Sequence, residues 1–178
     1  MNKRTPLISL VVLSLLLVVL SACAAPAAPP ARDVEISHEA ALSAQDALMG
    51  GIVMGEVMLS ESEFSSYVTK ALEANSGPNQ PIDSVMVWIE PDAMHFRVTL
   101  KDGVSMMGNT LDLVGNLMVS DGHLMVDLQS AGAGGMAVGG ALLAPVNAQI
   151  NAVLAQNIML PASVSVAQDS GSIAISMN

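Results

Sequence analysis

The stretch LSESEFSSYVTKAL, residues 59–72, predicts one well-defined helix and marks where it begins. Ser60 and Glu63 have the spacing of a capping box, in which each side chain satisfies a backbone N–H of the other residue. Apolar residues then recur at the spacing of one helical face, at Phe64, Tyr67, Val68, Ala71 and Leu72. The run Asn75-Ser76-Gly77-Pro78 predicts the end of this helix.

Upstream, the sequence predicts a short first helix followed by a strand. Residues Ser37–Met49 are rich in alanine, and the pair Gly50-Gly51 that follows them is typical of a helix end. Ile52–Leu59 is a predicted strand that leads directly into the capping box.

Downstream, the pattern changes to a period of two, which indicates strands that are buried on one face. The turn sequences Asp102-Gly103 and Asp121-Gly122 are typical of hairpins and favour an antiparallel meander. Gly108 and Gly115 are predicted to mark bends or bulges. The predicted strands are Ile82–Glu90, Met94–Leu100, Val104–Ser120 and His123–Gln129.

The C-terminal part predicts a second long helix and a closing hairpin. A glycine-rich turn over Gly132–Gly140 precedes a helix at Ala141–Gln156, with Pro145 near its start, where proline is tolerated. Two strands then flank Asp169-Ser170-Gly171, at Ser163–Ala167 and Ser172–Met177. We therefore predict an α+β fold, with a curved antiparallel sheet wrapped around or packed on two main helices and preceded by a short helix.

The N-terminus predicts export and lipidation. Lys3 and Arg4 precede an apolar run, Pro6–Leu20, that is too short to span a bilayer. The following Leu20-Ser21-Ala22-Cys23 resembles the lipobox of bacterial lipoproteins, and Cys23 is the only cysteine. The resemblance implies cleavage before Cys23 and a diacylglyceryl group on its thiol. The alternative is an ordinary signal-peptide cut among the neighbouring alanines.

Three segments follow from that interpretation: a cleaved signal peptide at residues 1–22, a lipidated linker at 23–33, and one domain at 34–178. The linker is rich in alanine and proline, which favours an extended spacer between membrane and domain. Ala24 lacks the aspartate that resembles an inner-membrane retention signal, so sorting to the outer membrane is compatible with the sequence.

Charge excludes nucleic acid as an expected partner. Removal of the signal peptide leaves 4 of the 6 basic residues and all 16 acidic ones, a formal charge of −12. Phosphate backbones require basic patches, and single strands require aromatic platforms. The chain has only four aromatic residues, Phe64, Tyr67, Trp88 and Phe96.

The reactive side chains do not form a recognisable catalytic or cofactor motif. His38, His95 and His123 are scattered, and no nucleophile elbow, zinc-protease or phosphate-loop motif occurs. Asp121 beside His123 is more typical of a solvated hairpin than of a zinc site, which normally has three or four ligands. Gly132, Gly134 and Gly135 are interpreted as a flexible connection. We therefore expect neither an enzyme nor a bound metal or cofactor.

Methionine is the unusual residue, with 13 in the chain and many on predicted strands. Flexible, polarizable methionine lines surfaces that accommodate varied apolar partners, but it equally fills a core that is short of aromatics. Both interpretations stay open at this point. The strand methionines are Met54, Met58, Met86, Met94, Met106, Met107, Met118 and Met125.

Three features resemble the small bacterial tubular-lipid-binding-like (TULIP-like) lipoproteins of the YceB and LmeA type. They are the Leu59–Tyr67 junction, the Pro81–Val85 start of the meander, and Asp121-Gly122-His123-Leu124; the last turn, Asp169-Ser170-Gly171, departs from that family's Asp-Gly turn. Over Ile52–Asn178, the resemblance implies an apolar groove for acyl chains and no catalytic residues. The groove candidates are Phe64, Val68, Leu72, Met94, Phe96, Val98, Val146, Ile150 and Val153.

These observations lead to two functional hypotheses. In the first, the chain is a membrane-anchored extracytoplasmic lipoprotein that binds lipid, a fatty-acyl chain or another apolar ligand between its helices and sheet. In the second, it is a structural or interaction lipoprotein of the cell envelope with a solid core and a protein partner. Both place it on the periplasmic or cell-surface side of the membrane that holds its anchor.

Overall fold

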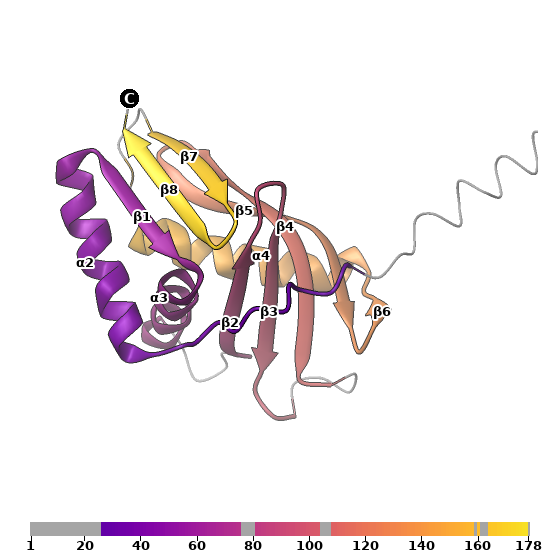
Figure 1. Cartoon of the computed structure of the whole chain (residues 1–178). Coiled ribbons are helices and arrows are strands. Elements are labelled where there is room, and N and C mark those ends of the chain that lie inside the picture. Colours follow the sequence, from indigo (N-terminus) through magenta and orange to yellow (C-terminus); the bar gives the residue numbers. More distant parts are fainter. Residues whose placement is uncertain (1–25, 76–80, 104–107, 159, 161–163, 178) are drawn as a thin grey trace, which may run out of the picture.

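The computed structural model describes residues 26–75, 81–103, 108–158, 160 and 164–177 (Figure 1). In this part of the chain, an α+β fold combines three helices with two antiparallel sheets. The helices are α2 (His38–Met54), α3 (Glu61–Ala74) and α4 (Gly140–Asn157). The larger sheet is ordered β2-β3-β4-β5-β6, and the smaller one β1-β8-β7.

The larger sheet is the predicted meander. It contains β2 (Ile82–Ile89), β3 (Met94–Leu100), β4 (Thr110–Ser120), β5 (His123–Ala133) and β6 (Met136–Ala137). Asp121 (φ 52°) and Gly122 (φ 76°) form the tight turn between β4 and β5, as predicted, since both central residues of such a turn need a positive φ. The register shifts between Val114 and Gly115, which confirms the predicted bulge.

Alternating burial along β3 fixes which face of the larger sheet meets the core. Met94, Phe96 and Val98 are buried, while His95 and Arg97 are half-buried on the opposite face. On that opposite face, Arg97 donates to Asp112 of β4 at 2.7 Å and lies over the ring of Trp88. The predicted alternation is therefore confirmed, and helices cover only the apolar face.

Helix side chains satisfy both edges of the larger sheet where strand partners are missing. At the β2 edge, α3 supplies the partners. At β5, the Asn151 side chain of α4 accepts from Val126 N at 2.7 Å and donates to Val126 O at 2.9 Å. Exposed strand edges invite pairing with other chains, so these contacts protect the sheet and fix where each helix lies.

The first helix is longer than predicted, and the strand expected over Ile52–Leu59 is present but begins later than predicted. α2 continues through the glycine pair and ends at Gly55, which adopts φ 88°, so β1 (Glu56–Ser60) begins later. Gly51 lies inside the helix because β1 folds back against it: a Cβ there would overlap Glu56 O and Val57 Cγ2. Glycine at this position permits close approach of a strand and does not end the helix.

The single predicted sheet is also corrected to two sheets. The closing hairpin, β7 (Val164–Asp169) and β8 (Ser172–Met177), pairs with β1 instead of extending the meander, with Glu56 opposite Ser176 and Ser60 opposite Ser172. The expected glycine-rich turn contains the two-residue strand β6, which pairs with the end of β5. In the described residues, neither sheet closes on itself. The predicted start of a strand at Val104 lies outside the described residues, and β4 begins at Thr110.

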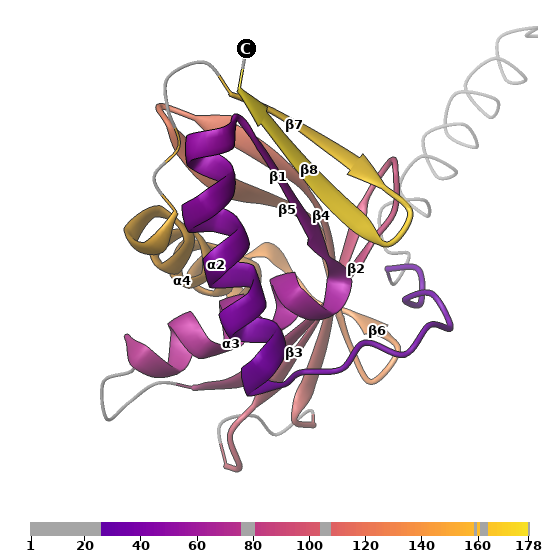
Figure 2. The same cartoon turned by 60° about the vertical axis from the view of Figure 1, so that its left-hand side comes forward.

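Figure 2 shows α2 lying across α3, with β1 returning beside α2. α3 packs on β2, α4 packs on β5, and the two helices touch each other. No helix in the described segments has the length and apolar content needed to span a membrane.

Residues 26–37, which we call the strap, cross the outer face of the larger sheet before α2 begins (Figure 1). Trp88 Nε1 of β2 donates to Arg32 O at 2.8 Å, and the ring of Pro26 lies against Gly132 at the end of β5. The described part of the expected spacer, residues 26–33, therefore lies on the domain.

Candidate functional site

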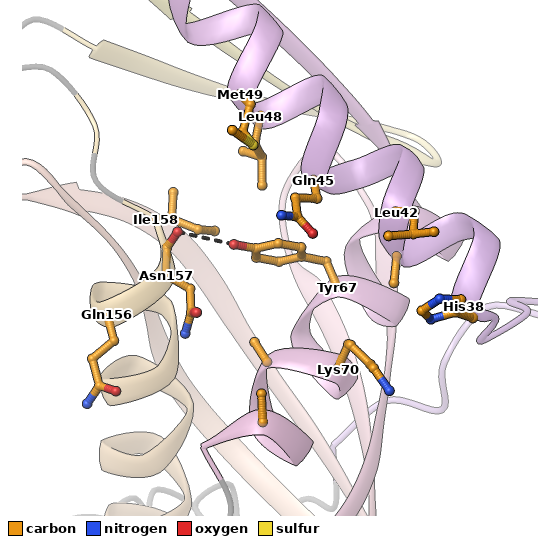
Figure 3. A pocket seen from close by; sticks show the side chains of 13 residues that line it. His38, Leu42, Gln45, Leu48, Met49, Tyr67, Lys70, Gln156, Asn157 and Ile158 are labelled. Carbon is orange, nitrogen blue, oxygen red and sulfur yellow. Dashed lines mark hydrogen bonds between the residues drawn. The ribbon is translucent and has the colours of Figure 1, made fainter.

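A pocket of about 500 Å³ opens between α2, α3 and the end of α4 (Figure 3). Its volume lies within the range of about 300–1,000 Å³ in which small-molecule sites are usually found. Residues from three separate parts of the chain line it: His38, Ala41, Leu42, Gln45, Leu48 and Met49 of α2, Tyr67, Lys70, Ala71 and Ala74 of α3, and Gln156, Asn157 and Ile158.

Small side chains explain why the helices leave this space. The face of α3 that turns toward the pocket carries Ala71 and Ala74, and α2 contributes Ala41. Alanines let two helices approach closely at their contact but fill little volume beside it. The pocket is thus a consequence of side-chain size at the α2–α3 interface.

Tyr67 spans the pocket from α3 to the end of α4. Its hydroxyl donates to Asn157 O at 3.1 Å, which joins two helices that are distant in sequence (Figure 3). Burial raises the pKa of Tyr67 above its ordinary value. The phenol is therefore neutral at physiological pH and supplies a flat apolar wall with one polar end.

Apolar and polar side chains both line the pocket. Leu48 and Ile158 are buried, Leu42 and Met49 are exposed, and polar groups complete the lining. One of these is Lys70, whose ammonium lies 2.9 Å from Glu73, with both side chains exposed. An apolar cavity with a few polar groups suits an amphiphile better than a fully polar metabolite.

The opposite face of α3 fixes the helix against β2 through a stripe of polar side chains at i, i+4 and i+8. Each accepts a hydrogen bond from a backbone N–H on the edge of β2. The three bonds run from Ile89 N to Glu61 Oε1 at 2.7 Å, from Val87 N to Ser65 Oγ at 2.8 Å, and from Val85 N to Thr69 Oγ1 at 3.0 Å. These bonds fix the position of the helix that presents Tyr67 and Lys70 to the pocket.

The start of α3 is fixed by the predicted capping box, which is confirmed. Ser60 and Glu63 exchange both hydrogen bonds, and Ser43 of α2 donates a further one to Glu63 at 2.6 Å. Burial acts to raise the pKa of Glu63, but the hydrogen bonds from Ser43 and from Ser60 outweigh it, and the pKa is lowered. The carboxylate therefore stays ionised and ties α2 to α3.

The nine predicted groove residues lie in the core and do not line this pocket. Val146 is half-buried and packs against the core cluster that contains the other eight. Those eight are at most 6% exposed, and they meet between the helices and the larger sheet. Cys23, the predicted lipidation site, lies outside the described residues. The eight buried groove residues are Phe64, Val68, Leu72, Met94, Phe96, Val98, Ile150 and Val153.

The sequence contained one signal for the pocket that was not used. Leu42 and Met49 are seven residues apart on one face of α2, and they are 48% and 66% exposed. Large apolar residues on the outer face of a helix indicate either a partner or a ligand. The alanines and the glycine pair predict the helix, but they do not reveal this apolar face with Leu42 and Met49.

The three histidines do not converge. His38 stands at the pocket, whereas His95 and His123 lie on β3 and at the start of β5. Within the described ranges, no three side chains among His, Cys, Asp and Glu lie close enough together to bind one metal ion.

No protein-family model matches this sequence, and no curated protein matches it either.

Proposed function

We propose that this chain is a lipid-anchored extracytoplasmic lipoprotein of the TULIP-like kind, which binds an acyl chain or a similar amphiphile. The observation that carries the proposal is the pocket between α2, α3 and α4, which is lined by apolar side chains and a few polar ones. In this proposal the lipobox at Cys23 supplies the anchor, and the TULIP-like assignment rests on the sequence resemblance.

The proposal places the ligand between helices, and not in the layer between helices and sheet. A ligand in that layer would have to separate Phe64, Phe96 and Ile150, which are buried in one core cluster. Opening a well-packed core is costly, since each lost apolar contact lowers stability. The pocket needs no such rearrangement.

The pocket's chemistry suggests how an amphiphile would lie. Its chain would contact Leu48, Met49 and Ile158, and the flexible methionine would adapt to chains of different shape. Its anionic end would lie near Lys70, whose charge is only partly satisfied by Glu73 in solvent.

Mass spectrometry of the chain purified from cells tests this proposal. A ligand that is present in native spectra and absent from denaturing spectra is non-covalent, which separates it from the lipid on Cys23. Leu42→Trp should fill the pocket and remove that mass, and it should also weaken binding of a fluorescent fatty acid at least tenfold. Met58→Trp is the matched control, because Met58 is an exposed apolar residue, 63% exposed, that does not line the pocket.

Wild type and Met58→Trp should then retain the ligand. Equal ligand occupancy in all three proteins would place the ligand elsewhere, and absence of ligand and of fatty-acid binding in wild type would reject a lipid-binding function.

The second candidate is a structural or interaction lipoprotein, and one observation favours it. Met54 is 89% exposed and Met58 63% exposed at the corner between α2 and β1. Exposed methionines are typical of protein contact surfaces. Photo-crosslinking from Met54 in the intact envelope would capture a discrete protein partner if this candidate is correct.

A further inference from the structure

The strap is held to the domain by a cluster of ionic contacts around Arg32. Its guanidinium lies 2.6 Å from Glu61 at the start of α3 and 2.7 Å from Glu90 after β2. It also donates to Ile89 O at 3.1 Å and to Ser170 Oγ, in the β7–β8 turn, at 3.3 Å. One side chain thus joins the strap to three separate elements.

The beginning of the strap is placed by a proline–glycine contact. A Cβ at Gly132 would lie 2.8 Å from Cδ of Pro26, closer than carbon atoms normally approach. Gly132 pairs with Ala137, so Pro26 lies against the hairpin formed by β5 and β6. The described chain therefore begins at this hairpin, and not beside the pocket.

The contact of Pro26 with Gly132 limits how far Cys23 can lie from the hairpin, because few residues separate Cys23 from Pro26. Pro26 is three residue steps from Cys23 in the sequence, and three steps span at most about 11 Å when fully extended. A free linker from Cys23 to Ser37 would instead reach about 50 Å. Docking of the strap therefore keeps the lipidated residue close to the β5–β6 hairpin.

The chain segment that forms that hairpin and α4 has no ionisable side chains, and the nearest charged group across the sheet, Asp112 opposite Gly132, is neutralised by its ion pair with Arg97. The sequence contains no Asp, Glu, Lys, Arg or His between Asp127 and Asp169, a stretch that includes the hairpin and all of α4. Met136, in the hairpin, is 58% exposed. In a mature chain with a formal charge of −12, this region can approach an anionic bilayer with the least electrostatic repulsion.

We propose that the strap orients the domain on the membrane, with the β5–β6 hairpin and the first turn of α4 against the bilayer that holds Cys23. This inference rests on the lipid anchor of the proposed function. The pocket lies at the opposite end of α4, about 25 Å away at 1.5 Å per residue. In this orientation the pocket lies at the end of α4 that is farther from the hairpin that meets the membrane.

Fluorescence quenching tests this orientation on the full lipidated protein. With Cys23 lipidated, an introduced cysteine is the only free thiol, so Met136→Cys and Met58→Cys can each carry one fluorophore. The two positions are similarly exposed, at 58% and 63%, and lie on different sheets. In phosphatidylethanolamine–phosphatidylglycerol vesicles with brominated acyl chains, the label at 136 should be quenched at least threefold more than the label at 58.

Two strap variants test whether the strap causes the difference. Arg32→Ala removes the ionic contacts, and Gly132→Ala displaces Pro26 at the other end. Each should bring the quenching ratio close to one while circular dichroism stays that of a folded domain. If Arg32→Ala unfolds the domain, Gly132→Ala still provides the test, because it acts at a separate site.

The outcomes distinguish this inference from the proposed function. The orienting role is overturned if both labels are quenched equally in vesicle-bound protein with an unaltered strap. It is also overturned if the quenching ratio is unchanged in the folded strap variants. Failure to co-sediment with vesicles overturns the anchor itself and the orientation with it. Loss of ligand in Leu42→Trp with unchanged quenching shows that pocket and orientation are independent, which supports both.

Discussion

Two neighbouring helices, α3 and α2, are held in different ways. α3 packs its apolar face on the larger sheet and hydrogen-bonds to the edge of β2 through Glu61, Ser65 and Thr69. α2 contacts α3 and β1 mostly through small side chains, and it exposes Leu42 and Met49. α3 is fixed by a row of bonds to a strand edge and by a filled core, whereas α2 is held by close approach and by a hydrogen bond from Ser43 to Glu63 near the start of α3.

The difference explains where a ligand site can form. A helix whose face is buried and hydrogen-bonded cannot shift without leaving polar groups unpaired, which costs free energy. A helix packed through alanines leaves space beside its contact and can adjust. The pocket accordingly lies on the α2 side of α3, while the α3–sheet layer is filled.

The largest expected difference between the two helices is in the loss of stability when a large side chain is truncated. Phe64→Ala, on the sheet side of α3 at 1% exposure, should lower the free energy of unfolding by about 3–5 kcal/mol. Leu42→Ala, on the outer face of α2, should change it by less than about 0.5 kcal/mol. Urea denaturation of the two variants measures both values, and similar losses would contradict the distinction between the two helices.

A pair of adjacent glycines tests close approach in α2. Gly51→Ala should destabilise by about 3 kcal/mol, because the new methyl would overlap β1. Gly50→Ala should stabilise by up to about 1 kcal/mol, since alanine is the better helix former and its Cβ would meet no described atom within 4 Å. Thermal unfolding should shift in opposite directions, and a shared direction would show that β1 does not limit position 51.

The hydrogen bonds between α3 and β2 should have an intermediate effect. Thr69→Val keeps the shape of the side chain but leaves Val85 N–H without its acceptor, which should cost about 2 kcal/mol. Thr69→Ser retains the hydroxyl and should lose less. Equal loss in the two variants, measured by urea denaturation, would assign the effect to the methyl group instead.

The smallest expected effect on stability comes from the Glu63 carboxylate, whose hydrogen bonds between the helices depend on pH. Its pKa is lowered in the folded protein, so its contribution is present above the ordinary value of 4.5 and disappears as pH falls through the lowered pKa. Glu63→Gln should therefore be less stable than wild type by about 0.3–1 kcal/mol at pH 7, the usual contribution of a negative charge in the first turn of a helix. The difference should vanish once the pH has fallen below the lowered pKa of Glu63.

Ser43→Ala serves as the control for that effect, because it removes the hydrogen bond from α2 and should reduce the same pH-dependent difference. A constant difference between wild type and Glu63→Gln from pH 7 to acid would show that ionisation of Glu63 does not stabilise the fold.

The sequence predicts α3 well because its signals are local. The capping box and the apolar stripe lie within one continuous segment, and both are confirmed. The boundary between α2 and β1 was wrong because the reason for Gly51 is tertiary, namely the approach of a strand. Local patterns cannot distinguish a glycine that ends a helix from one that permits a contact.

Long-range pairing limited the rest of the prediction. β1 pairs with β8, which is more than 100 residues away in the sequence. Nothing in either strand alone specifies that partner. The pocket was missed for the same reason, since His38–Met49, Tyr67–Ala74 and Gln156–Ile158 meet only in the folded chain. Its alanines, its leucines and Met49 form no sequence pattern comparable to a catalytic motif.

The contacts of Arg32 also have a mechanical consequence. If Cys23 is held in a bilayer, as proposed, tension on the domain first acts on the contact of Pro26 with Gly132 and then on the ion pairs to Glu61 and Glu90. Release of the strap from Pro26 to Ser37 adds about 40 Å of reach. Undocking of the strap would therefore lengthen the linker between membrane and domain. The contacts of Arg32 set the force at which the strap undocks.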